Sequence, residues 1–148
     1  MWVMDRLRGV VINRMSTLIE PEAQEWIATL SVSTQHQISE GRKLAIDRLS
    51  RRGAITSATK ISLAREFNVE GWLKEGCQEL VYREAVFSDE EEEAIGPKTA
   101  CKLYRLRLQG VKHAFNSSYY NHSRVSAETI HKEFEAELKA IRNSGAMN

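Results

Sequence analysis

The stretch that decides the fold is residues 60–80, KISLAREFNVEGWLKEGCQEL. Within it Ile61, Ala64 and Phe67 recur every third residue, the spacing that lines one side of a helix. Asn68 then suits the left-handed backbone conformation that often ends a helix. A second apolar stripe follows, formed by Val69, Trp72, Leu73, Leu80 and Val81. The stretch therefore predicts two amphipathic helices joined by a tight turn.

Three small residues in and beside this pair of helices lead to further predictions. Ser57 is placed to cap the first helix with its side-chain oxygen. Gly71 and Gly76 lie inside the second helix, where each costs about 1 kcal/mol relative to alanine. Packing against the rest of the protein has to make up that loss.

The chain before residue 57 predicts three more helices. The first covers residues 3–18, and it closes before Pro21 because the residue preceding a proline is pushed out of helical geometry. The second begins at Pro21, and a polar stretch over residues 31–37 separates it from the third. The inward residues of the second and third helices are expected to be Ala23, Trp26, Ile27, Leu30, Ile38, Ala45, Ile46 and Leu49.

Beyond residue 81 the pattern predicts three further helices. Ser88 and Glu91 have the spacing of a capping box, which marks the start of a short helix. Residues 95–97, Ile-Gly-Pro, end that helix and start the next. A polar loop over residues 116–124 precedes a last helix over about residues 126–142. The inward residues of the last two helices are expected to be Ala100, Leu103, Tyr104, Leu108, Val111, Ile130, Phe134, Leu138 and Ile141.

The composition agrees with a compact all-α domain of about seven or eight short helices. The chain has 148 residues, 42% hydrophobic and 28% charged, with only two prolines and eight glycines to interrupt helices. No alternating pattern typical of strands occurs. The expected core residues are Trp26, Ile46, Leu49, Ala64, Phe67, Trp72, Leu73, Leu80 and Leu103.

Charge and cysteine content argue against several classes of function. The formal net charge is +1, so no global field attracts nucleic acid or an anionic membrane. Cys77 and Cys101 form no paired motif, and the N-terminus lacks the pattern of a secretory signal. No apolar stretch approaches the roughly 20 residues that cross a bilayer. We therefore expect a cytoplasmic or nuclear protein with reduced thiols that does not bind membranes.

Two stretches, residues 26–49 and residues 60–107, resemble the helical region that follows the BTB/POZ fold in a large group of fungal proteins. The resemblance covers about residues 24–108, and the residues that carry it are Trp26, Ala45, Ile46, Leu49, Ala64, Arg65, Phe67, Val69, Trp72, Leu73, Glu91 or Glu92, Ile95 and Gly96. It implies an intracellular protein-interaction or adaptor module without cofactor or catalytic residues.

The resemblance also implies a division of the chain. Residues 1–20 form an N-terminal helix too short to supply the BTB/POZ fold itself, and residues 21–112 form the helical domain. Residues 113–125 are a linker, and residues 126–148 are a C-terminal helix with a frayed tail. Because the BTB/POZ fold is the part to which dimerisation is usually attributed, self-association is left open.

A helix-turn-helix that binds DNA is the alternative reading of residues 63–73. In that reading the helix that begins near Glu70 enters the major groove. Its acidic residues Glu75 and Glu79 would face phosphates, which dominate affinity for DNA, and Lys74 stands where an aliphatic residue should be buried. We therefore favour ordinary helix packing here.

The residue types that usually carry catalysis or bind metals have unsuitable spacing. The acidic run over residues 89–93 lacks the alternating ligands and glycine of a calcium loop. The four histidines match no zinc motif. Cys77 with His131 or His113 is a conceivable thiol nucleophile and base, but nearby glutamates favour the protonated thiol. We expect no catalytic, metal or cofactor residues.

One helix surface is strongly basic and leaves two explanations open. Its residues are Lys98, Lys102, Arg105, Arg107 and Lys112. The surface either contacts an acidic partner or RNA, or is a solvated face that balances the acidic run before it, and we favour the latter. Together these observations predict an adaptor that binds other proteins whose identity the sequence does not reveal.

Overall fold

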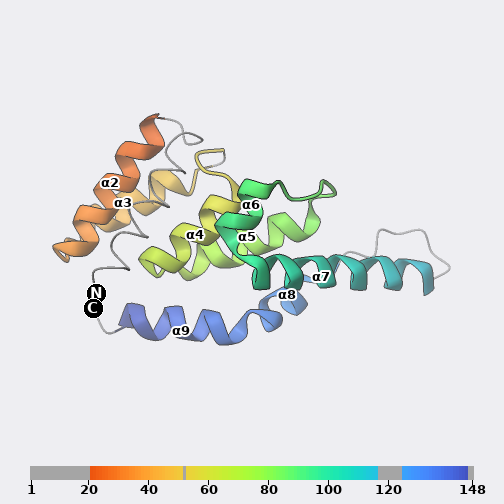
Figure 1. The fold of residues 1–148 in the computed structure, drawn as a ribbon. Helices are drawn as coiled ribbons and strands as arrows, with labels where there is room; N and C mark the ends of the chain where they lie inside the picture. The colour runs from red at the N-terminus through yellow and green to blue at the C-terminus, as the bar shows by residue number, and fades with distance from the viewer. Residues whose placement is uncertain (1–20, 52, 117–124, 147–148) are drawn as a thin grey trace. The chain divides into compact units, whose positions relative to one another are not determined.

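The computed structural model describes residues 21–51, 53–116 and 125–146, and every regular element within them is an α-helix. This confirms the predicted all-α fold. The expected helix over residues 3–18 and nearly all of the loop over residues 116–124 lie outside the described residues. The eight helices are α2 Pro21–Gln35, α3 Ser39–Leu49, α4 Ser57–Phe67, α5 Glu70–Tyr82, α6 Asp89–Ile95, α7 Pro97–Asn116, α8 Ala127–Glu133 and α9 Glu135–Ala146 (Figure 1).

The chain divides into two compact units, residues 1–56 and residues 57–148. The described part of the first unit holds α2 and α3, which pack against each other. The polar stretch predicted to separate them is largely helical, because α2 continues to Gln35. Within that stretch Ser33 is buried, and its side chain lies where a Cβ on Gly41 would have to go. The small residues thus let the two helices approach closely.

The expected core of this first unit is only partly correct. Ala23, Leu30, Ala45 and Leu49 are buried as predicted, and they form its interior. Trp26, Ile27 and Ile46 are only half-buried, and Ile38 is exposed. Two helices can enclose few side chains, so the Trp26 ring instead packs beneath the Arg48 guanidinium, whose central carbon lies 5.5 Å from the ring centroid. The Trp26 and Ile46 core predictions were therefore wrong.

The second unit is organised around α5, which packs against α4, α7, α8 and α9. Its buried residues are Trp72, Leu73, Gly76, Cys77, Leu80 and Val81. Asn68 takes the predicted left-handed conformation, with φ of 56°, and turns the chain from α4 into α5. The core residues predicted for this unit are all buried: Ala64, Phe67, Trp72, Leu73, Leu80 and Leu103.

Gly76 lets α4 and α5 approach each other closely. A Cβ built on it would lie 2.8 Å from Ile61 Cγ1 and 2.9 Å from the Ser57 carbonyl oxygen. Nearby, the Ser57 hydroxyl donates to Glu79 Oε2 at 2.6 Å, and the buried Lys60 ammonium donates to Glu79 Oε1 at 2.8 Å. Ser57 thus begins α4 and joins it to α5, and the expectation that it caps the helix was wrong.

Arg65 joins four helices of the second unit with one guanidinium. It leaves α4 and forms an ion pair with Glu137 of α9. It also donates to the Ile95 carbonyl at the end of α6 and to the buried Thr99 hydroxyl of α7, both at 2.6 Å. The planar group with five donors suits such a position, because its hydrogen bonds leave in several fixed directions.

Some of the ends predicted for the later helices are correct, and one is wrong. Ser88 and Glu91 form the predicted capping box of α6, and Gly96 ends that helix with φ of 86°. The single helix expected over residues 126–142 is instead two helices, because the backbone leaves helical geometry at Phe134. The Phe134 side chain is buried there, and the Lys102 ammonium lies 5.1 Å from its ring centroid.

Substitution of Gly76 by alanine should destabilise the protein, although alanine is the better helix former. The new methyl group would be forced against Ile61 and the Ser57 carbonyl, at a cost of about 1–3 kcal/mol. Gly71 is the matched control, because nothing lies within 4 Å of a Cβ at that position. Gly71→Ala should stabilise by about 0.5–1 kcal/mol. Urea unfolding followed by circular dichroism measures both, and equal effects would contradict the close approach.

Replacement of Arg65 by methionine should lower the free energy of unfolding by about 2 kcal/mol or more, because it leaves partly buried acceptors without a donor. Arg142→Met is the control, since that exposed arginine also pairs with a glutamate. Arg142→Met should lower the free energy of unfolding much less than Arg65→Met, because solvent screens an exposed ion pair. If urea unfolding showed that the two substitutions lower the free energy of unfolding equally, the contacts of Arg65 would stabilise the protein no more than an exposed ion pair does.

Candidate protein-binding surface

The outer face of α7 exposes apolar side chains that the sequence places in the core. Leu103 and Leu106 are buried in the first half of the helix, whereas Leu108 and Val111 are 60% and 52% exposed. The prediction of one continuous inward stripe was wrong for these two residues. In Figure 1 the second half of α7 extends past the ends of α5 and α6.

Arg107 points inward rather than outward, which corrects a second expectation for α7. Its guanidinium donates to the Leu80 carbonyl at 2.6 and 3.1 Å and to the Ala85 carbonyl at 2.9 Å. Carbonyls in the last turn of a helix lack partners within the helix, and Leu80 lies in the last turn of α5. Arg107 therefore completes the end of α5 and holds the connection that follows it.

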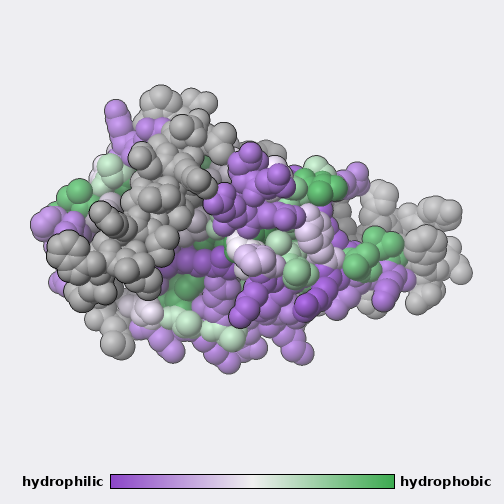
Figure 2. Space-filling view, viewed as in Figure 1, coloured by the Kyte–Doolittle hydropathy of each residue, from purple (hydrophilic) through white to green (hydrophobic). Residues whose placement is uncertain are grey.

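The connection from α5 to α6 contains one buried aromatic residue and one large apolar residue that is exposed. Phe87 is buried, with its ring centroid 4.6 Å from that of Tyr104 and 4.4 Å from the Arg107 guanidinium. Val86, beside it, is 78% exposed. Figure 2 shows hydrophobic surface over this connection and over the second half of α7 on the same face of the second unit.

Two carboxylates of the acidic run stabilise this region through contacts within the chain. Arg83 pairs with Glu91 through two hydrogen bonds of 2.6 and 2.7 Å. Glu91 also accepts from the Ser88 amide, and these partners, led by Arg83, lower its pKa. Glu92 accepts from the Tyr104 hydroxyl at 3.1 Å. These carboxylates are structural, and they are not available to bind a cation.

The exposed face of α7 combines apolar and positively charged residues. We define the α7 face as Arg105, Leu108, Val111 and Lys112, all of which are exposed. Residues 97–112 contain five basic residues and no acidic one. Among the described residues, no ion pair joins Arg105 or Lys112 to a carboxylate. The face is therefore apolar at its centre and basic at its edges.

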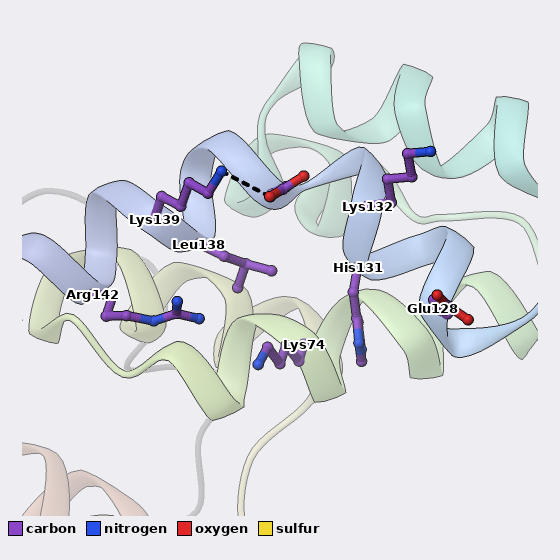
Figure 3. Close-up of a pocket in the computed structure, with 8 residues that line it drawn as sticks. Lys74, Glu128, His131, Lys132, Leu138, Lys139 and Arg142 are labelled. Atoms are coloured by element: carbon purple, nitrogen blue, oxygen red, sulfur yellow. Dashed lines mark ion pairs between the residues drawn. The ribbon is translucent and has the colours of Figure 1, made fainter.

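A second candidate is a shallow hollow of about 460 Å³ between α5, α8 and α9. Its lining residues are Lys74, Glu128, His131, Lys132, Glu135, Leu138, Lys139 and Arg142. In Figure 3, Lys74 and Arg142 extend toward one another over α5, whereas Lys132 and Lys139 extend the other way from α8 and α9. Because these side chains are mostly long and charged, the hollow lacks the apolar lining of a typical small-molecule site.

The cations of this hollow are largely neutralised within the chain. Glu70 accepts from Arg142 at 2.6 Å and pairs with Lys74 at 2.9 Å. Hydrogen bonds from Arg142 and then Lys74 lower the pKa of Glu70 to about 2. Glu135 pairs with Lys139 at 2.8 Å. Three of the four lysine and arginine side chains that line the hollow are thus paired with carboxylates, which leaves little free positive charge to bind an anion.

Among the described side chains, the thiol and histidine groups considered from the sequence are not joined into a site. Cys77 is buried, and burial raises the pKa of its thiol to about 12. No hydrogen bond joins it to His131 in the described part of the chain, and the side chains of His113 and His122 lie outside that part. Over residues 21–51, 53–116 and 125–146, no group of three histidine, cysteine, aspartate or glutamate residues is arranged to hold a metal ion.

A comparison with protein-family models, with curated proteins and with solved structures finds no match to this chain. None of the helices described is both long enough and apolar enough to cross a membrane. The function of the α7 face is therefore inferred from its geometry. Sequence reasoning detected its basic residues, but it assigned Leu108 and Val111 to the core and missed Val86.

The ion pairs of Glu70 should make stability depend on pH in the acidic range. The folded-state pKa lies near 2, below the ordinary value of 4.5. The stabilisation is therefore present above about pH 4.5 and is lost as the pH falls toward 2. Glu70→Gln should flatten this part of the curve of unfolding free energy against pH. Glu84→Gln, on the exposed connection after α5, is the control, and equal effects of the two would contradict the assignment.

Proposed function

We propose that this chain is a non-catalytic module that binds another protein through the α7 face. The observation that carries the proposal is the exposure of Leu108 and Val111 on a helix whose first half buries Leu103 and Leu106. Exposed apolar side chains that lie together and are bordered by polar residues are typical of protein-binding surfaces. Val86, on the connection from α5 to α6, is a further exposed apolar residue of the same unit.

Two further observations support this proposal. The sequence resembles the helical region that follows the BTB/POZ fold in fungal proteins, which implies an adaptor or scaffold role. The side chains that chemistry would need are also engaged elsewhere, since Cys77 is buried with a raised pKa, and Glu91 is bound to Arg83. An enzyme would need a cleft with converging polar groups, and Cys77 has no such surroundings in the described residues.

The DNA-binding alternative fits the packing of α5 poorly. A helix that reads the major groove must expose its outer face, but α5 packs against four other helices of its unit. The residues it does expose include Glu75 and Glu79, which phosphates would repel. Protein binding through α7 is therefore the better supported function.

The double substitution Leu108→Ser and Val111→Ser should abolish partner binding without unfolding the protein. The matched control is Leu44→Ser with Val32→Ser, which changes the same residue types at comparable exposures of 47% and 53%. Tagged wild-type and variant chains would be used to recover partners from the native cell extract, with quantitative mass spectrometry. Unfolding curves would verify that all three proteins fold.

We expect at least one protein to be enriched by the wild-type and control chains and lost, by about tenfold or more, with the α7 variant. Loss of the same protein with the control variant would place binding elsewhere. If folded wild-type chain enriched no protein, the proposal would be wrong.

A further inference from the structure

We infer that the segment bound by the α7 face is an acidic amphipathic helix, and this inference rests on the proposed function. Its carboxylates would lie beside Arg105 and Lys112, and its apolar side chains would pack on Leu108 and Val111. Charge complementarity with the α7 face identifies this occupant.

The two cations of the α7 face, Arg105 and Lys112, form no ion pair with a carboxylate among the described residues. Lys102 donates to the Glu133 carbonyl and Arg107 to the Leu80 and Ala85 carbonyls, so neither is paired with a carboxylate through these contacts. Arg105 and Lys112 are exposed and take part in none of the ion pairs of the described chain. An acidic partner would therefore meet cations that it need not displace from other partners.

The arrangement of these residues suits a helix laid along α7. Arg105, Leu108 and Lys112 are three and four residues apart, which places them in a row along one side of the helix. The row is about 10 Å long from Arg105 to Lys112, or two helical turns. Val111 widens the row beside Leu108. Apolar residues at three- and four-residue spacing on a partner helix would match this length.

Nucleic acid is a weaker candidate for this surface. Leu108 and Val111 occupy the centre of the face, where a phosphate backbone would gain nothing from apolar contact. The chain also has a net charge of only +1, and the acidic α6 lies beside α7. Only two exposed cations lie on the α7 face, so few phosphates would be neutralised.

A second copy of this chain is also a poorer occupant than a different protein. The most acidic element is α6, with four acidic residues in its first turn. Its one large apolar residue, Ile95, is fully buried, and Glu91 and Glu92 are bound internally. The α6 of a second copy would therefore bring charge without an apolar side chain for Leu108 and Val111.

The test measures binding of designed helical peptides to the full chain by fluorescence anisotropy. One probe has a leucine stripe flanked by glutamates, and the second has lysines in place of the glutamates. We expect the acidic probe to bind at least about tenfold more tightly than the basic one, and more weakly as salt is raised, because salt screens exposed charges.

A charge-reversal variant distinguishes the loss of charge complementarity from a loss of folding. Arg105→Glu with Lys112→Glu should weaken binding of the acidic probe by about tenfold or more and should improve binding of the basic probe. The matched control is Arg51→Glu with Lys43→Glu, which makes the same charge change at exposed positions of the first unit. That control should bind both probes as the wild type does.

Several results would overturn the inference. One is equal affinity for the two probes, and another is an affinity for the acidic probe that the charge reversal of Arg105 and Lys112 leaves unchanged. A single-stranded RNA probe that bound more tightly at the same residues would also contradict it. So would self-association through Leu108 and Val111, measured by sedimentation. Partner capture that depends on Leu108 and Val111, together with no preference for the acidic probe, would refute this inference and leave the protein-interaction proposal standing.

Discussion

The helices of the second unit depend on Arg65 for their mutual placement. Most of them have between 7 and 13 residues, lengths at which an isolated helix is barely stable in water. They persist because they pack together, and apolar contact alone does not select one relative orientation. One guanidinium that bonds to Glu137, the Ile95 carbonyl and Thr99 places α9, α6 and α7 around α4.

The same principle explains the region between α5 and α6. Arg107 completes the last turn of α5, and Arg83 with Glu91 ties the end of α5 to the start of α6. These charged groups form hydrogen bonds and ion pairs within the chain, and Glu70 does the same in the hollow lined by α5, α8 and α9. On the α7 face, by contrast, Leu108 is 60% exposed and Arg105 takes part in no ion pair of the described chain, and these two features support the proposed binding role.

Much of the fold could be predicted because its signals are local. The turn at Asn68, the capping box at Ser88 and the end of α6 at Gly96 all depend on residues within one helical turn of each other. The candidate site could not be predicted to the same extent. The spacing of Leu108 and Val111 with Leu103 is that of a buried stripe, and whether a helix is covered along its whole length depends on the lengths and positions of its neighbours.

The sequence by itself determined that this chain is helical, where several of its helices begin or end, and that Ile61, Ala64 and Phe67 of α4 and Trp72, Leu73, Leu80 and Val81 of α5 are buried. It did so because three-to-four-residue apolar spacing and capping residues act within a single helix. Only the tertiary structure decided that Arg107 turns inward, that the backbone breaks at Phe134, and that Leu108 and Val111 of α7 are exposed. These outcomes depend on carbonyls and side chains supplied by distant segments, which no local pattern encodes.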